Sequence, residues 1–200
     1  NAQAQDPYES IVWQTDFNEA DWSATSDNGE AVPANAPAGW ELGNTGDSAW
    51  YWRWSNVGPR GYWFNGGDCN TPAEALESTT AGNGFMMLEL DYFNTLDDCS
   101  DFTNAPVNAY MEYTQGIDFS DYGAVHLIFE QWHRFCCIPG GAWFEFSTDD
   151  GTTWQSIDMF EHYPVAVGAR NGTTTDIDIT DMVAGQSNVT FRIRTENLSQ

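Results

Sequence analysis

The stretch Ser147-Thr148-Asp149-Asp150-Gly151-Thr152-Thr153-Trp154 decides the fold of this chain and reads S-x-D-x-G-x-T-W. In such a turn the Asp149 carboxylate accepts hydrogen bonds from backbone N–H groups, and Gly151 supplies a positive φ angle. The flanking residues 142–146 and 154–157 alternate like strands. The stretch therefore predicts an Asp-box hairpin with Trp154 as an apolar plug. The structural residues of the turn are Ser147, Asp149, Gly151, Thr153 and Trp154.

Aromatic and turn-forming residues extend this prediction to an all-β domain. The chain has 10 Trp, 8 Tyr, 12 Phe and 18 Gly in 200 residues, and turn clusters recur along it as in β-sandwiches. We expect an N-terminal segment at 1–10 and a single domain over 11–200, with a loop-rich insertion at about 18–84 and one helical turn at 73–77. Strands are expected at 11–17, 85–91, 111–113, 117–119, 125–132, 142–147, 153–159, 175–179 and 189–194, with a turn between 113 and 117 and the arginines of the last strand pointing outward.

The charge of the chain is strongly negative. Six arginines and no lysine stand against 30 acidic residues, which gives a net charge of -24. Such a surface repels nucleic acid and anionic membranes. It either serves solubility alone or also binds divalent cations. No stretch approaches the ~20 apolar residues of a membrane helix, and the small polar start at residues 1–6 is typical of a mature end after signal cleavage. An extracellular location is therefore expected.

The chain has four cysteines, and no two of them form a C-x-x-C pair: Cys69, Cys99, Cys136 and Cys137. In a secreted chain this indicates disulfides rather than a zinc site. Three fully paired connectivities exist. Pairing Cys69 with Cys99 leaves an adjacent pair, whereas in the alternative each adjacent cysteine reaches one of the distant two; both remain open.

Two kinds of binding site are expected. Aromatic side chains stack on sugar rings, and the Gly-rich region around residues 50–63 predicts a glycan site, with a minor core beneath a long loop as the alternative. Its candidates are Trp50, Trp52, Trp54, Tyr62 and Trp63. Loop carboxylates and amides are the hard ligands that Ca²⁺ prefers. The candidate clusters are Asp16, Asn18, Glu19 and Asp21, and Asp91, Asn94, Asp97, Asp98 and Asp101.

Catalytic patterns are weak. The chain has three histidines, contains neither G-x-S-x-G nor H-E-x-x-H, and carries a single Asp-box. A non-catalytic protein is therefore expected.

The order of four segments resembles a known family. The segments are Gly82–Tyr92, a strand ending in Gln131-Trp132, an aromatic strand leading into the Asp-box, and Gly185–Arg194. They look like the jelly-roll modules of secreted Bacteroidetes surface proteins, which are similar to cleaved-adhesin domains and more remotely to MAM domains. The resemblance covers about residues 80–196, with a weaker match at 11–22.

The resemblance implies a jelly-roll β-sandwich of two antiparallel sheets with long decorated loops, stabilised by calcium and exported by type IX secretion. It favours Asp16, Glu19 and Asp91 as calcium ligands, and Asp47-Ser48-Ala49 resembles the O-glycosylation pattern of Bacteroidetes, which makes Ser48 a candidate. Family members continue into a further strand, so an open sheet edge is expected unless the protein is longer.

The expected function is adhesion or assembly at a bacterial cell surface. The partners would be a surface glycan or protein, or a neighbouring protomer at the open sheet edge. Two alternatives are an accessory carbohydrate-binding domain of a secreted hydrolase and a self-assembling extracellular filament subunit.

Overall fold

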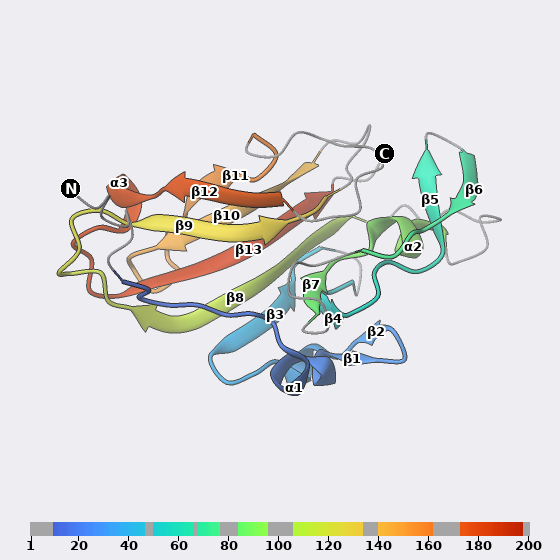
Figure 1. The fold of residues 1–200 in the computed structure, drawn as a ribbon, viewed down its shortest axis with the longest axis horizontal. Coiled ribbons are helices and arrows are strands. Elements are labelled where there is room, and N and C mark those ends of the chain that lie inside the picture. The colour runs from blue at the N-terminus through green and yellow to red at the C-terminus, as the bar shows by residue number, and fades with distance from the viewer. Residues whose placement is uncertain are drawn as a thin grey trace, which may run out of the picture.

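A computed structural model describes residues 10–46, 50–65, 68–76, 84–95, 106–133, 140–161 and 173–197. Strands dominate these residues, and the three α-helices among them are short (Figure 1). The all-β prediction is confirmed. No helix in the described ranges has the length and apolar character needed to cross a membrane.

The largest sheet has five antiparallel strands in the order β11-β10-β13-β8-β3. Its longest strands, β8 and β13, lie side by side in the middle of the sheet (Figure 1). The strands are β3 (Trp40–Asn44), β8 (Val107–Ile117), β10 (Gly140–Ser147), β11 (Gln155–Asp158) and β13 (Val189–Asn197).

A second layer of β9 (His126–Gln131) and β12 (Thr173–Asp178) covers this sheet. The short helix α3 (Thr180–Val183) follows β12. Successive side chains of a strand point to opposite faces, so one face of each layer is apolar. The main core fills the space between the layers; its buried residues are Ile117, Phe119, Val125, Phe144, Phe146, Met159, Ile177, Ile179, Val183, Val189 and Phe191. The described residues thus form an antiparallel β-sandwich.

The insertion predicted at about 18–84 is only partly separate, because β3 lies within it and joins the large sheet. The rest of it, together with the following β7 and α2, forms a group of small elements beside β3 and β8 (Figure 1). The buried residues Trp22 and Trp54 of this group pack with Leu42 and Met111 of the large sheet in a second core. The elements are α1 (Glu19–Trp22), η1 (Ser23–Thr25), β1 (Ser26–Asp27), β2 (Glu30–Ala31), η2 (Pro33–Asn35), β4 (Arg53–Ser55), β5 (Tyr62–Asn65), β6 (Asp68–Pro72), β7 (Phe85–Met87) and α2 (Leu90–Thr95).

The prediction of a strand at 11–17 is wrong. These residues form no strand, although Trp13, Thr15 and Phe17 alternate in burial with more exposed neighbours. The Trp13 ring lies 4.9 Å from that of Phe191 and 5.1 Å from that of Tyr113. The alternating burial in this segment therefore reflects side chains that pack on one side, without backbone hydrogen bonds to a neighbouring strand.

Three further local predictions are wrong. Residues 113–117 belong to the continuous strand β8 rather than a turn, because Tyr113 and Ile117 both pair with β13. Residues 73–76 are not helical, and the strand expected to reach Asp91 ends at Met87 before α2 begins.

Candidate ligand-binding face

The side of the large sheet that points away from the main core is polar and aromatic. In β13, Phe191 and Ile193 face the core, so Arg192 and Arg194 project to the opposite side, as predicted. We call this side the outer face. It consists of Glu41, Gly43, Asn108, Tyr110, Glu112, Trp143, Glu145, Ser156, Arg192, Arg194 and Glu196, with Trp154 at its margin.

Glu145 of β10 is the centre of the outer face. Only 3% of this residue is exposed. Its carboxylate accepts hydrogen bonds from Nε of Arg192 at 2.5 Å, Nε of Arg194 at 3.0 Å and Oγ of Ser156 at 3.1 Å. A buried carboxylate is stable when it is paired in this way, and here it fixes the direction of both guanidinium groups.

Both guanidinium groups lie on indole rings. The Arg192 Cζ is 4.0 Å from the ring centroid of Trp154, and the Arg194 Cζ is 4.3 Å from that of Trp143. These are cation–π distances. The Nη atoms of Arg192 make no hydrogen bond within the described part of the chain, and the side chain is 21% exposed. This leaves rigidly held N–H donors beside aromatic rings.

Tyr110 and the acidic residues of β8 and β3 complete the outer face. The Tyr110 ring lies against Gly43, where a Cβ would come within 2.1 Å of the ring. Its hydroxyl donates to Glu41 at 2.7 Å. Burial, together with the Glu41 carboxylate, raises the pKa of Tyr110 to about 12. Burial also raises the pKa of Glu112, against the opposing charge of Arg192.

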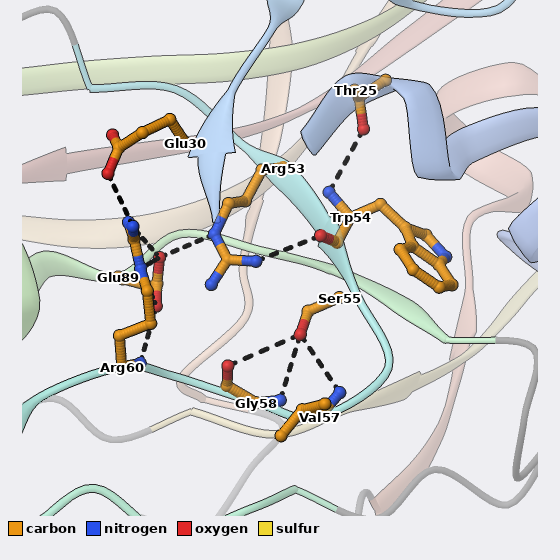
Figure 2. A network of polar contacts seen from close by, with 9 residues as sticks. All are labelled: Thr25, Glu30, Arg53, Trp54, Ser55, Val57, Gly58, Arg60 and Glu89. Carbon is orange, nitrogen blue, oxygen red and sulfur yellow. Dashed lines mark hydrogen bonds and ion pairs between the residues drawn. The ribbon is translucent and has the colours of Figure 1, made fainter. Parts of the chain in front are cut away.

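A second polar network holds the elements of the insertion together (Figure 2). Glu89 accepts hydrogen bonds from Nε of Arg53 at 2.7 Å and from the backbone N–H of Arg60 at 2.7 Å. Burial alone raises the pKa of Glu89, but the hydrogen bonds and charges of the two arginines outweigh it and hold that pKa below its usual range. Arg60 also pairs with Glu30 at 2.6 Å and lies 3.7 Å from the Tyr92 ring centroid.

The Asp-box turn forms as predicted. Asp149 accepts hydrogen bonds from the backbone N–H and the hydroxyl of Thr153, at 2.9 and 2.7 Å, and from Ser147 Oγ at 2.8 Å. Gly151 has φ +78°. These hydrogen bonds lower the pKa of Asp149, and those from Thr153 have the largest effect. Trp154 donates its indole N–H to the Gly151 carbonyl at 3.1 Å and also supports Arg192.

The described residues bring together no group of three or more His, Cys, Asp or Glu side chains that would hold a metal ion. Asp16, Glu19 and Asp91 therefore do not form such a group, while Asp97 and Asp98 lie outside the described residues. The side-chain amide of Asn18 donates to both Asp16 and Asp21, at 3.0 and 2.9 Å. Calcium remains a prediction.

The five aromatic candidates for glycan binding are largely packed against protein. Trp54 is 7% exposed in the second core, and Trp52 packs against that core. Trp50 stacks on Phe93 with ring centroids 4.9 Å apart. Tyr62 and Trp63 lie half-buried on β5, where Trp63 contacts Trp132 at 5.7 Å. Trp52 and Trp54 thus belong to a minor core, which was the alternative to a glycan site for this region.

Cys69 lies on β6 and is disulfide-bonded. Cys99, Cys136, Cys137 and Ser48 lie outside the described residues, so the connectivity and the O-glycosylation remain predictions.

The outer face was not predicted as a site. Its residues come from five strands, and Arg192 and Glu145 are 47 positions apart. The available signal was the alternation of Trp143 and Glu145 with buried phenylalanines in one strand, opposite outward arginines in another.

Comparison of the chain with protein-family models, with curated proteins and with solved structures finds no match.

Proposed function

We propose that this chain is a non-catalytic extracellular binding module that holds saccharides on the outer face and so mediates adhesion at a bacterial cell surface. The observation that carries the proposal is the pairing of Arg192 and Arg194 with one buried carboxylate, Glu145, while their guanidinium groups lie on Trp154 and Trp143.

The chemistry of the outer face suits sugars. Sugar hydroxyls accept hydrogen bonds from guanidinium N–H groups and donate them to carboxylates. The apolar C–H faces of a sugar ring pack on aromatic rings such as Tyr110 and Trp143. The rings and guanidinium groups are fixed by Gly43 and Glu145, so little conformational entropy is lost on binding.

The charge of the outer face favours neutral saccharides. Arg192 and Arg194 are outnumbered by the carboxylates around them, which belong to Glu41, Glu112, Glu145 and Glu196. The chain as a whole carries a net charge of -24. Highly anionic glycans would therefore be repelled.

A glycan array followed by calorimetry tests the proposal. We expect neutral oligosaccharides to bind, and Trp143→Ala and Arg192→Gln each to weaken the best ligand about tenfold or more. Ile128→Thr on β9 is the matched control, since Ile128 is 49% exposed on the other layer. Equal affinities of all three folded variants and the parent protein would refute the role of the outer face.

An accessory carbohydrate-binding domain of a secreted hydrolase would use the same surface, and domains encoded next to this sequence distinguish it from an adhesin. Assembly through a sheet edge would involve β3 or β11, which end the described sheet. Analytical ultracentrifugation tests assembly, and concentration-dependent polymers would support it.

Calcium binding is proposed as a stabilising role, supported by the acidic loops and by the contact of Asp16 and Asp21 with one amide, Asn18. A ligand that binds only the folded state raises the melting temperature. Thermal unfolding in calcium and in EDTA measures this, and identical melting temperatures would contradict it.

A further inference from the structure

A cavity of about 240 Å³ lies between the start of the insertion and β4. It is separate from the outer face, with which it shares no residue. Its walls are Ser23, Ser26, Gly29, Arg53, Trp54, Ser55 and Asn56. The volume corresponds to roughly eight water molecules at ~30 Å³ each, which is below the size of drug-binding pockets but sufficient for one small ring.

Arg53 is the charged residue of this cavity, and it is 4% exposed. Its Nε donates to Glu89 at 2.7 Å and its Nη1 donates to the Trp54 carbonyl at 3.1 Å. Its Nη2 makes no hydrogen bond to the described residues, and Figure 2 shows this nitrogen with no partner among the residues drawn. This nitrogen is not among the enclosed polar atoms that lack a partner in the described structure, so its N–H groups are accessible from the cavity, where water or a ligand hydroxyl can accept from them.

Other polar groups on the cavity wall are also free within the described structure. The hydroxyls of Ser23 and Ser26 and the amide of Asn56 make no hydrogen bonds to described residues, although all three line the cavity. In contrast, the Ser55 hydroxyl accepts from the backbone N–H of Gly58 at 3.0 Å and is already used. The cavity therefore gathers donors and acceptors that suit hydroxyl groups.

The guanidinium group is held in place without an excess of charge. Glu89, whose side chain is 1% exposed, binds both Arg53 and Arg60, and Arg60 continues to Glu30. Two arginines thus face two carboxylates, so the network is neutral. A neutral network in a chain of net charge -24 gives little attraction for a free anion.

We propose that this cavity binds one neutral pyranose ring, whose hydroxyl oxygens accept from Nη2 of Arg53 and exchange hydrogen bonds with Ser23, Ser26 and Asn56. The site is independent of the outer face and would operate whether or not that face binds sugars.

Two-dimensional NMR with ¹⁵N-labelled protein tests the proposal, using the methyl glycosides of glucose, galactose and mannose, with sodium acetate and phosphate as charged probes. At least one glycoside should shift the Nε–H signal of Arg53 and the backbone amides near Ser26, with a millimolar Kd. Absence of shifts with every glycoside would overturn the proposal, and so would shifts with acetate or phosphate alone.

Variants locate the binding. Ser26→Val places apolar bulk in the cavity without touching the ion-pair network, and should weaken the bound glycoside about tenfold or more. Arg53→Gln removes the guanidinium N–H donors and should also weaken binding. If Arg53→Gln does not fold, Ser26→Val still tests the site. Ser120→Val, outside the cavity, is the matched control. Trp143→Ala should leave the Kd of the glycoside unchanged, and loss of binding in this variant would assign the signal to the outer face. An unchanged Kd in Ser26→Val would refute the cavity site.

Discussion

The side-chain amide of Asn188 lies directly against Gly116, so closely that a Cβ on Gly116 would come within 1.6 Å of its Oδ1. The same amide donates to Asp150 of the Asp-box turn at 2.6 Å. Gly116 thus lets one side chain connect the end of β8 to the turn between β10 and β11. The Asp-box is therefore fastened to the middle of the sheet as well as to its own hairpin.

Gly116→Ala should destabilise the protein by about 0.5–1.5 kcal/mol, because the exposed side chain of Asn188 must swing away from the strand and lose its hydrogen bond to Asp150. Urea unfolding measures the change. Gly123→Ala is the control, since nothing lies within 4 Å of a Cβ at Gly123. Asn188→Ala removes the same hydrogen bond, so adding it to Gly116→Ala should cost little more, and fully additive costs of the two changes would contradict this account.

Glu89→Gln should destabilise the protein by about 3–5 kcal/mol, because it leaves the buried guanidinium of Arg53 without its charged partner. Denaturant unfolding gives this value. Glu30→Gln, whose carboxylate belongs to the same network with 63% of its side chain exposed, should cost only about 0–1 kcal/mol. Similar costs for both changes would mean that burial does not determine the importance of this network.

Asp149 should make stability depend on pH. The N–H and hydroxyl of Thr153 and the hydroxyl of Ser147 lower the pKa of this carboxyl in the folded state. Its contribution is therefore present above the unfolded pKa of about 3.9 and is lost as pH falls through the lower folded value. Asp149→Ala should reduce the acid-induced fall in urea midpoint over this range, whereas Asp121→Asn should preserve it. An identical acid profile for Asp149→Ala would contradict the prediction.

The Tyr110 hydroxyl should resist ionisation. Burial and Glu41 raise its pKa to about 12, above the ordinary value, so its contribution to stability holds below about pH 10 and is lost as pH rises through the folded pKa. NMR of ¹³C-labelled tyrosine resolves this titration from those of the other tyrosines. Glu41→Gln should lower the pKa of Tyr110, while Glu30→Gln should not; an unchanged value in Glu41→Gln would exclude the carboxylate as a cause.

Local chemistry was predictable from the sequence. The Asp-box depends on contacts within Ser147–Trp154, and the outward arginines of β13 follow from simple alternation. Residues 11–17 show the limit of this reasoning, because Trp13 alternates with its neighbours while packing on rings rather than joining a ladder. Alternation reports burial of one side of a chain, and it does not report a hydrogen-bonding partner.

The outer face and the cavity depend on register between distant segments. Trp143 stands opposite Arg194, and Arg53 meets Glu89 across 36 positions. Nothing in either local sequence specifies these partners. The aromatic cluster at Trp50–Trp63 was visible in the sequence. The packing of Trp54 was not, because Trp54 donates its hydrogen bonds to the distant Phe17 carbonyl and Thr25 hydroxyl.

The placement of the arginines makes trypsin cleavage sensitive to local unfolding of this protein. Arg53, Arg60, Arg192 and Arg194 are tied into two carboxylate networks, and the chain has no lysine. Trypsin cleaves only after these two residue types, and it needs an extended, accessible backbone. Cleavage after Arg53 or Arg192 therefore requires that a strand first leave its sheet. The rate at which those tryptic fragments form would measure how often the insertion and the large sheet each come apart.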